Sequence, residues 1–135
     1  MKISNTCGYA ISAKTRIAAA PAGAIVSNSS ICKAANLPER YMLQLLRKLV
    51  HAEALISARG VQGGYKLARP ASKITLLEIV EAIDGPIGGN EPFALVGMAP
   101  GSAGVLANAL TAVAGDTRKR LAGITVADLR AAKAA

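Results

Sequence analysis

Two stretches of the chain carry side chains whose types and spacing suit contact with a nucleic acid. In the first, Arg40 and Gln44 are four residues apart and therefore neighbours on one face of a helix. Arginine can form paired hydrogen bonds with guanine, and glutamine can do the same with adenine. Arg47 and Lys48 follow in the same run and suit phosphates, which position a helix without reading sequence. The alternative is that these residues form a solvated helical face. We favour DNA contact because the second stretch, a predicted wing, would bind DNA through the same surface of the protein.

The second stretch is the glycine-rich segment 56–67, in which Arg59 lies at the base of a loop. The loop glycines are Gly60, Gly63 and Gly64. Glycine permits the positive φ angles and the close backbone approach that a tight hairpin requires. A hairpin after a helical run is the order of a winged helix-turn-helix. We therefore predict that the hairpin is a wing and that Arg59 enters a DNA groove.

The residues on either side of this loop alternate between apolar and other types. The apolar ones are Ile56, Ala58, Tyr65 and Leu67. A period of two is typical of a hairpin that has one face on a core. We therefore expect these four side chains to share the buried face of the hairpin.

Three helices are predicted before the hairpin. The first covers residues 8–20, and the second follows Ser27 as its N-cap. The third begins at Pro38 and runs to about Ala52. Its predicted apolar face consists of Tyr41, Leu45, Leu46, Leu49 and Val50. Asn36 suits the left-handed conformation of the turn between the second and third helices. The polar face of the third helix would then lie in the major groove.

A further helix is predicted after the hairpin, because Thr75 and Glu78 have the spacing of a capping box. Its inward residues would be Leu76, Leu77, Val80 and Ile83. The domain organisation that we expect is a winged helix-turn-helix over residues 1–85, a Gly/Pro-rich linker over 86–104 and a helical dimerisation region over 105–135. The expected fold class is mainly α with a small β-hairpin.

The predicted dimerisation region carries an apolar stripe at helical spacing. Its members are Val105, Leu106, Ala109, Leu110 and Val113, and Gly115 interrupts it. Thr125 and Asp128 resemble the start of a last short helix.

Charge is unevenly distributed along the chain, whose formal net charge is +8. Residues 1–73 hold eleven Lys and Arg against two Asp and Glu, whereas residues 74–135 hold five against six. A basic first half favours a polyanion-binding module, although a generally basic protein is the alternative. Aromatic residues make up only 3% of the chain, which disfavours the stacking platforms of single-strand binders and favours duplex DNA.

Cysteine usage and hydropathy bear on the compartment. Cys7 and Cys32 are the two cysteines, and they do not form the disulfide framework of a secreted protein. The N-terminus lacks the apolar core of a signal peptide. The uncharged stretch between Glu91 and Asp116 is too rich in Ala, Gly and Pro for a membrane span. We expect a cytoplasmic protein with no membrane partner.

Three motifs in order resemble the Rrf2 family of bacterial transcription regulators. They lie at residues 41–46, 59–70 and 74–82, and the opening residues 1–4 with Tyr9-Ala10 fit the same pattern. The resemblance covers residues 1–86 and weakens beyond them. It implies a winged-helix homodimer, usually a repressor, that binds a dyad-symmetric operator and pairs its subunits through a long C-terminal helix. By position, it implies DNA contacts from Tyr41, Gln44 and Arg59.

The sequence differs from the family pattern in two places, and each difference limits which family properties we expect in this protein. Leu43 stands where many relatives have glutamate, so their operator preference does not transfer. Several relatives hold an iron–sulfur cluster on three closely spaced cysteines after the capping-box helix, whereas residues 86–104 contain none. Cys7 and Cys32 lack metal-site spacing, and the lone His51 suits capping or exposure better than ligation. We expect no metal and no cofactor.

The leading prediction is therefore a sequence-specific DNA-binding regulator, and the alternative is a winged-helix module that binds protein and has no operator. With one histidine and no phosphate-binding loop, we expect no enzymatic activity. The sequence does not identify the signal that controls DNA binding. Oxidation of Cys32 or Cys7 is one candidate, and a small ligand near Phe93 and Met98 is another. The alternative for Cys32 is a small buried apolar residue.

Overall fold

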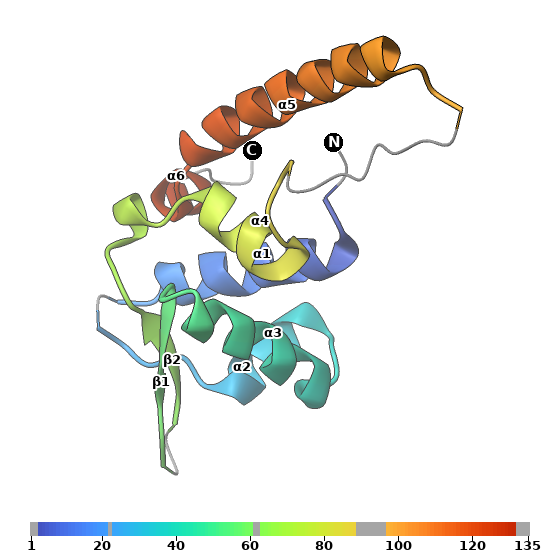
Figure 1. The fold of residues 1–135 in the computed structure, drawn as a ribbon. Coiled ribbons are helices and arrows are strands. Elements are labelled where there is room, and N and C mark those ends of the chain that lie inside the picture. Colours follow the sequence, from blue (N-terminus) through green and yellow to red (C-terminus); the bar gives the residue numbers. More distant parts are fainter. Residues whose placement is uncertain (1–2, 22, 61–62, 89–96, 132–135) are drawn as a thin grey trace.

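The computed structural model describes residues 3–21, 23–60, 63–88 and 97–131 (Figure 1). The elements in chain order are α1 (Asn5–Ala19), α2 (Asn28–Ala35), α3 (Glu39–His51), β1 (Leu55–Ala58), β2 (Gly64–Leu67), the 3-10 turn η1 (Ala71–Lys73), α4 (Leu76–Asp84), α5 (Pro100–Ala122) and α6 (Val126–Ala131). This confirms the mainly helical fold with a small hairpin. Within the described residues, no helix combines the length and apolar character that a membrane span requires.

Helix α1 begins at Asn5, earlier than the predicted residue 8, because Ser4 caps it. The Ser4 Oγ accepts a hydrogen bond from the Cys7 backbone N–H at 3.0 Å and donates one to Asp84 Oδ1 at 2.6 Å. One hydroxyl therefore satisfies a free amide at the start of α1 and joins that start to the end of α4.

The helix-turn-helix forms as predicted. Ser27 Oγ accepts a hydrogen bond from the Ser30 N–H at 3.2 Å and starts α2, and Asn36 ends it with a left-handed φ of 53°. Helix α3 buries Met42, Leu45, Leu46 and Leu49. The prediction omitted Met42, which is fully buried, and included Tyr41 and Val50, which are only half-buried. The buried stripe is thus rotated towards Met42 relative to the predicted one.

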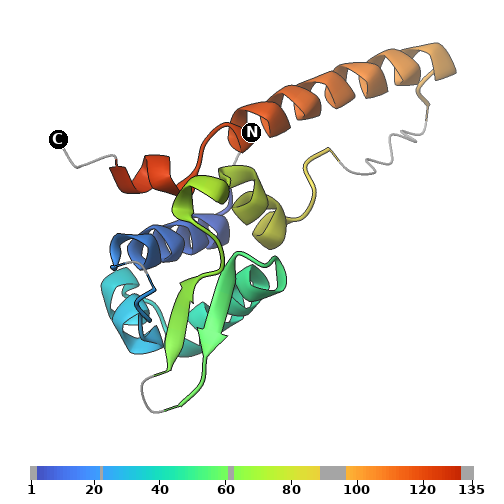
Figure 2. The same cartoon turned by 90° about the vertical axis from the view of Figure 1, so that its left-hand side faces the viewer.

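The hairpin forms, and Tyr65 of β2 is buried as predicted, but the predicted facing of β1 was wrong. Leu55 pairs with Leu67, and Ile56 pairs with Lys66. Leu55 is 2% exposed and Ile56 is 44% exposed, so Leu55 occupies the core position that was assigned to Ile56 and Ala58. Successive residues of a strand face opposite sides, so a shift of one residue exchanges the two faces. Figure 2 shows the two strands beside the helix-turn-helix, with the loop end of the hairpin reaching below it.

Helices α4, α5 and α6 complete the chain. The predicted capping box is present, with Thr75 N–H donating to Glu78 Oε2 at 3.0 Å and Glu78 N–H donating to Thr75 Oγ1 at 3.2 Å. Ile79, which the prediction omitted from the inward face of α4, is fully buried. Helix α5 begins at Pro100, inside the predicted linker, and continues through Gly115 without interruption.

The last helix, α6, packs on the body of the fold and not on α5. It lies along α1 and contacts η1, and its Val126 is fully buried (Figure 2). The reciprocal bonds between Thr125 and Asp128 that start it measure 2.8 and 3.2 Å. Part of the region predicted for dimerisation therefore belongs to the winged-helix core.

Candidate nucleic-acid interface

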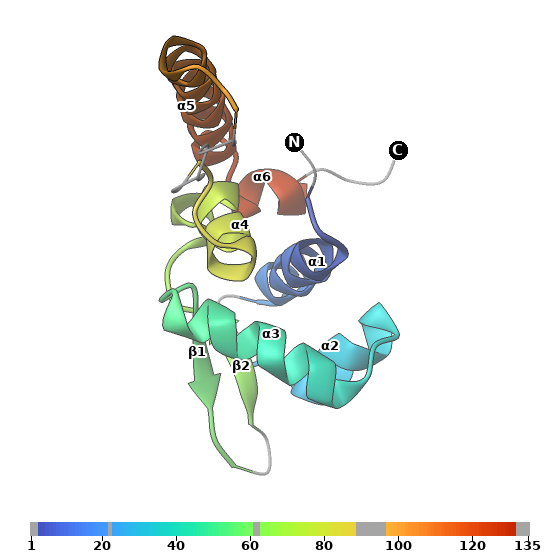
Figure 3. The same ribbon diagram turned by 45° about the vertical axis from the view of Figure 1, so that its right-hand side comes forward.

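The polar face of α3 is exposed along its whole length. Its cationic and amide side chains are Arg40, Gln44, Arg47 and Lys48, and all four are exposed. The opposite face of the helix is buried against the core. Figure 3 shows α3 and the hairpin at the same end of the molecule, with α5 at the other end. The fold thus brings the two predicted DNA-contacting stretches to one end, which we call the α3–wing end.

The wing loop has the backbone that its glycines predict. Arg59 follows β1 directly and is exposed, and Gly60 adopts a φ of +114°. A Cβ on Gly64 would lie 2.2 Å from the Val26 carbonyl oxygen, so no other residue fits there. Val61 and Gln62 lie outside the described residues. Gly63 and Gly64 therefore shape the wing through backbone approach, while Arg59 supplies its charge.

Gly64 lets the segment before α2 pair with the wing. Val26 and Tyr65 exchange two backbone hydrogen bonds, each 2.9 Å long. This isolated bridge places Val26 beside β2, on the side opposite β1. The wing is consequently bonded to the helix-turn-helix along one edge.

Tyr41 has a contact that the sequence did not reveal. Its hydroxyl and the Thr6 Oγ1 are hydrogen-bonded at 2.8 Å. Its ring meets that of Tyr9 edge-on, with centroids 6.3 Å apart. These contacts hold the N-terminal end of α3 against α1. Tyr41 therefore positions α3 against α1.

Arg69 joins the end of the wing to α4. It donates to the Lys73 carbonyl at 3.0 Å, to the Glu53 carbonyl at 3.4 Å and to both carboxylate oxygens of Glu78 at 3.2 Å. Burial, the largest single effect, raises the pKa of Glu78, but the hydrogen bonds from Arg69 and from the Thr75 N–H, together with the charges of Arg69 and Lys14, bring this pKa below its ordinary value. Arg69, within one of the family-like motifs, thus has a structural role at the base of the wing.

Lys14 is a buried cation that sequence reasoning missed. It is 0% exposed, and its Nζ donates to the carbonyl of Ala54, which also accepts from the Ala68 N–H at 3.3 Å. Burial lowers the pKa of Lys14 to about 7; the charge of Arg69 adds to this effect and that of Glu78 opposes it. The burial of Lys14 could have been predicted from its position on the face of α1 that also carries Ala10 and Ile17.

Both cysteines are buried free thiols. Burial, with a smaller effect of Asp84, raises the pKa of Cys7 to about 11, and burial followed by Glu39 raises that of Cys32. Cys32 Sγ lies 3.7 Å from Asn28 Oδ1, and Asn28 in turn donates to Glu39 Oε1 at 2.9 Å. A raised pKa lowers the fraction of reactive thiolate, so these environments favour the structural reading of both cysteines.

Among the residues that the structure describes, the side chains do not fit a metal centre. A cluster held by three cysteines would need one more than the chain has. The described ranges contain no group of three His, Cys, Asp or Glu side chains arranged to hold a metal ion. Met98 is described, whereas Phe93, the other residue of the predicted ligand region, lies outside the described residues.

Known proteins share both the sequence pattern and the fold. The HTH-type transcriptional regulator IscR of Cereibacter sphaeroides is 35% identical over 113 residues, which cover 82% of this chain and 72% of that protein. A regulator of the same type from Mycobacterium tuberculosis is 32% identical over 64% of this chain, which spans only 54% of that protein's length.

The structure of CymR, the global cysteine regulator of Bacillus subtilis, superposes with a TM-score of 0.78 at 27% identity and covers 99% of both chains. These relatives are regulators of transcription and not enzymes. The profile of the Rrf2 family, described as iron-dependent transcriptional regulators, matches residues 3–132. The chain therefore belongs to the Rrf2 family of winged helix-turn-helix transcriptional regulators.

Proposed function

We propose that this protein is a sequence-specific DNA-binding regulator that binds a dyad-symmetric operator as a homodimer and represses transcription. The observation that carries the proposal is that α3, whose polar face is exposed, and the hairpin whose first strand is followed by Arg59 lie at one end of the fold. In winged helix-turn-helix proteins such a helix enters the major groove while the wing contacts the adjacent backbone or groove.

The roles of the individual side chains follow from their chemistry. Arg40 and Gln44 lie in the N-terminal half of α3 and read base edges. Arg47 and Lys48 bind phosphates, and Arg59 of the wing binds the adjacent groove. Each phosphate contact releases counterions, so affinity should fall steeply as salt rises. The concentration of Lys and Arg in residues 1–73 supports this polyanion partner.

Helix α5 supports the homodimer. It has 23 residues and is about 35 Å long at 1.5 Å per residue. Val105 is 71% exposed and Val113 is 61% exposed, on a face where the small Ala109 permits close helix approach. Arg118 of α5 donates to Glu81 of α4, and this ion pair anchors α5 to the body of the fold. A second copy of α5 would cover the apolar face.

A twofold dimer would present two α3 helices to two half-sites of an operator. Half-sites one helical turn apart, about 34–36 Å, or at multiples of that distance, would place both helices on the same side of the duplex. An operator that overlaps a promoter would then exclude the polymerase, which is the basis of the proposed repression.

Selection of bound sequences from a random duplex pool, followed by footprinting, tests this function. We expect a palindromic consensus with two equally protected half-sites. Transcription in vitro from a promoter that contains the site should fall as the protein is added. Recovery of unenriched sequences would instead leave the chain as a protein-interaction module. Activation of the promoter would contradict repression while preserving DNA binding.

A further inference from the structure

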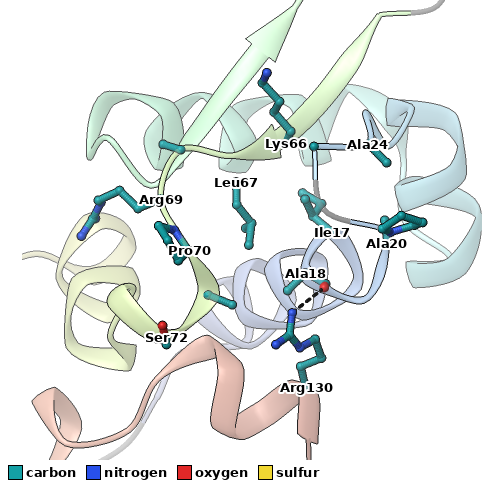
Figure 4. A pocket seen from close by; sticks show the side chains of 14 residues that line it. Ile17, Ala18, Ala20, Ala24, Lys66, Leu67, Arg69, Pro70, Ser72 and Arg130 are labelled. Carbon is teal, nitrogen blue, oxygen red and sulfur yellow. Dashed lines mark hydrogen bonds between the residues drawn. The ribbon is translucent and has the colours of Figure 1, made fainter.

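A cavity lies between the end of strand β2 and helix α6. Its volume is about 480 Å³, within the range of small-molecule sites. The end of α1, strand β2, the turn η1 and helix α6 form its walls (Figure 4). The walls consist mainly of small or apolar groups, among them Ala18, Ala20, Leu67 and Pro70.

The charge of this cavity is of one sign. Lys66, Arg69 and Arg130 line it, and none of the described lining residues is acidic. Figure 4 shows the Lys66 amine and the Arg69 guanidinium directed away from Arg130, and Glu78 already pairs with Arg69. Arg130 forms no ion pair with any carboxylate in the described part of the chain. Lys66 likewise has no ion pair among the described residues, but its amine lies on the other side of the cavity. Arg130 therefore provides the uncompensated positive charge on the α6 side of the cavity.

Arg130 is also held in place by the fold. One guanidinium nitrogen donates to the Ala18 carbonyl at 3.2 Å, which fixes the side chain across the end of α1. The remaining N–H groups are available to a ligand. A planar guanidinium with parallel N–H groups matches a carboxylate, and the neighbouring Ala, Leu and Pro side chains match an aliphatic chain.

We propose that this cavity binds a small aliphatic monocarboxylate, with its carboxylate on Arg130 and its hydrocarbon part against Ala18, Leu67 and Pro70, and that the bound acid changes operator affinity. The regulatory half of this proposal rests on the proposed DNA-binding function. Its reason is geometric: Leu67 belongs to the returning strand of the wing, and Arg130 belongs to α6, which follows the proposed dimer helix. A ligand that contacts both would alter the position of the wing relative to the body.

Heteronuclear NMR on the full chain tests the binding half directly. Acetate, butyrate, isovalerate and hexanoate are titrated at constant ionic strength, with isovaleramide and inorganic phosphate as matched controls. We expect saturable amide shifts at Ala20, Gly23, Ala68 and Ser72 with the longer acids. Equal shifts with isovaleramide would remove Arg130 from the site. Equal shifts with phosphate, or no shifts with any acid, would overturn the carboxylate site.

Two variants distinguish the contribution of the Arg130 charge to ligand binding from that of the cavity volume. Arg130→Gln keeps a donor for Ala18 but removes the charge, and it should raise the Kd for isovalerate by about tenfold or more. Ala20→Leu keeps the charge and fills part of the cavity, and it should weaken hexanoate more than acetate. Lys33→Gln removes a positive charge from the exposed side of α2, away from the cavity, and should leave the Kd unchanged. If Lys33→Gln matched Arg130→Gln, the effect would be one of general charge, and the site would be wrong.

The regulatory half is measured with a fluorescent duplex that carries the selected operator. Saturating isovalerate should change the operator Kd at least about threefold for the native chain, and Arg130→Gln should lose this response. NMR shifts without a change in operator affinity would leave the site intact and refute its regulatory role. NMR shifts together with a failure to select any operator would refute the proposed function and keep the ligand site.

Discussion

Arg69 and Glu78 meet through two hydrogen bonds of 3.2 Å, and this ion pair joins the segment that follows β2 to the first turn of α4. Both side chains are more than one-third exposed, so solvent screens the pair and its contribution to stability is small. Its effect lies in geometry, because the same arginine also binds two carbonyls around the base of the wing.

Replacing Arg69 should therefore affect DNA binding more than folding. We expect Arg69→Met to lower the free energy of unfolding in urea by about 1 kcal/mol or less. Operator affinity should fall further than this, since the wing loses its tie to α4. Glu78→Gln, which keeps an oxygen for the cap, should produce a similar loss. If the double variant lost the sum of the two single losses, the pair would not act as a unit.

Lys14 should make stability depend on pH near neutrality. Its pKa is about 7 in the folded chain and about 10.4 in an unfolded one, so between these values the unfolded chain binds the extra proton. The free energy of unfolding should thus rise with pH from about 7 to about 10, by at most about 1.4 kcal/mol per pH unit from this group. Below the folded pKa the full penalty of the buried charge remains.

Lys14→Met checks this origin of the pH dependence. The Ala54 carbonyl keeps its bond from the Ala68 N–H, so the variant should fold. Urea denaturation at several pH values should show a flatter slope than in the native chain. An unchanged slope would assign the pH dependence to another group.

Tyr41 offers a test that separates positioning from DNA contact. Tyr41→Phe and Thr6→Val each remove one partner of the 2.8 Å hydrogen bond, and each should destabilise the fold by about 1 kcal/mol. If Tyr41 only positions α3, the two variants should weaken operator binding equally. A larger loss for Tyr41→Phe would show that the hydroxyl also contacts DNA.

Arg59 should contribute to operator binding without contributing to assembly. We expect Arg59→Ala to raise the operator Kd by about tenfold and, if the contact is to phosphate, to reduce the salt slope by about one unit. Lys73→Ala removes an equal charge from the exposed turn η1, outside the α3–wing end, and serves as the control. Unchanged binding by Arg59→Ala to all selected duplexes would contradict the wing assignment.

The exposed stripe of α5 should determine the oligomeric state. Val113→Glu places a charge at the C-terminal end of that stripe, on a side chain that is 61% exposed, and should convert a dimer to a monomer in sedimentation velocity. Thr111→Glu, exposed on a different side of the same helix, should leave the dimer intact. Equal behaviour of the two variants would show that subunits pair elsewhere.

The sequence predicted the elements better than their facing. Leu55 and Ile56 are both apolar, so the alternation that begins at either residue fits a strand, and only the pairing of Ile56 with Lys66 resolves the choice. The burial of Lys14 was not predicted because lysine is almost never fully buried. Its hydrogen-bond acceptor, the Ala54 carbonyl, is also a backbone atom forty residues away. Arg69 was read as part of a motif, whereas its partners come from three separate segments.

The exposed face of α3, in contrast, could be predicted. Its polar residues follow the helical period, and local spacing predicts which side is exposed, although the edges of the buried stripe were misplaced at Met42, Tyr41 and Val50. The cavity beside Arg130 could not, because its walls come from four elements that only the tertiary fold brings together.

The bond between Val26 and Tyr65 has a mechanical consequence. Ser27, the residue after Val26, is the cap of α2, so a displacement of β2 pulls directly on the first turn of the helix-turn-helix. The wing therefore cannot move independently of the helix-turn-helix. If the hairpin bends when the protein binds a duplex, β2 would transmit this displacement to α2. The size of the displacement would depend on how easily the DNA itself bends. The flexibility of DNA outside the contacted bases would thereby affect which operators are bound.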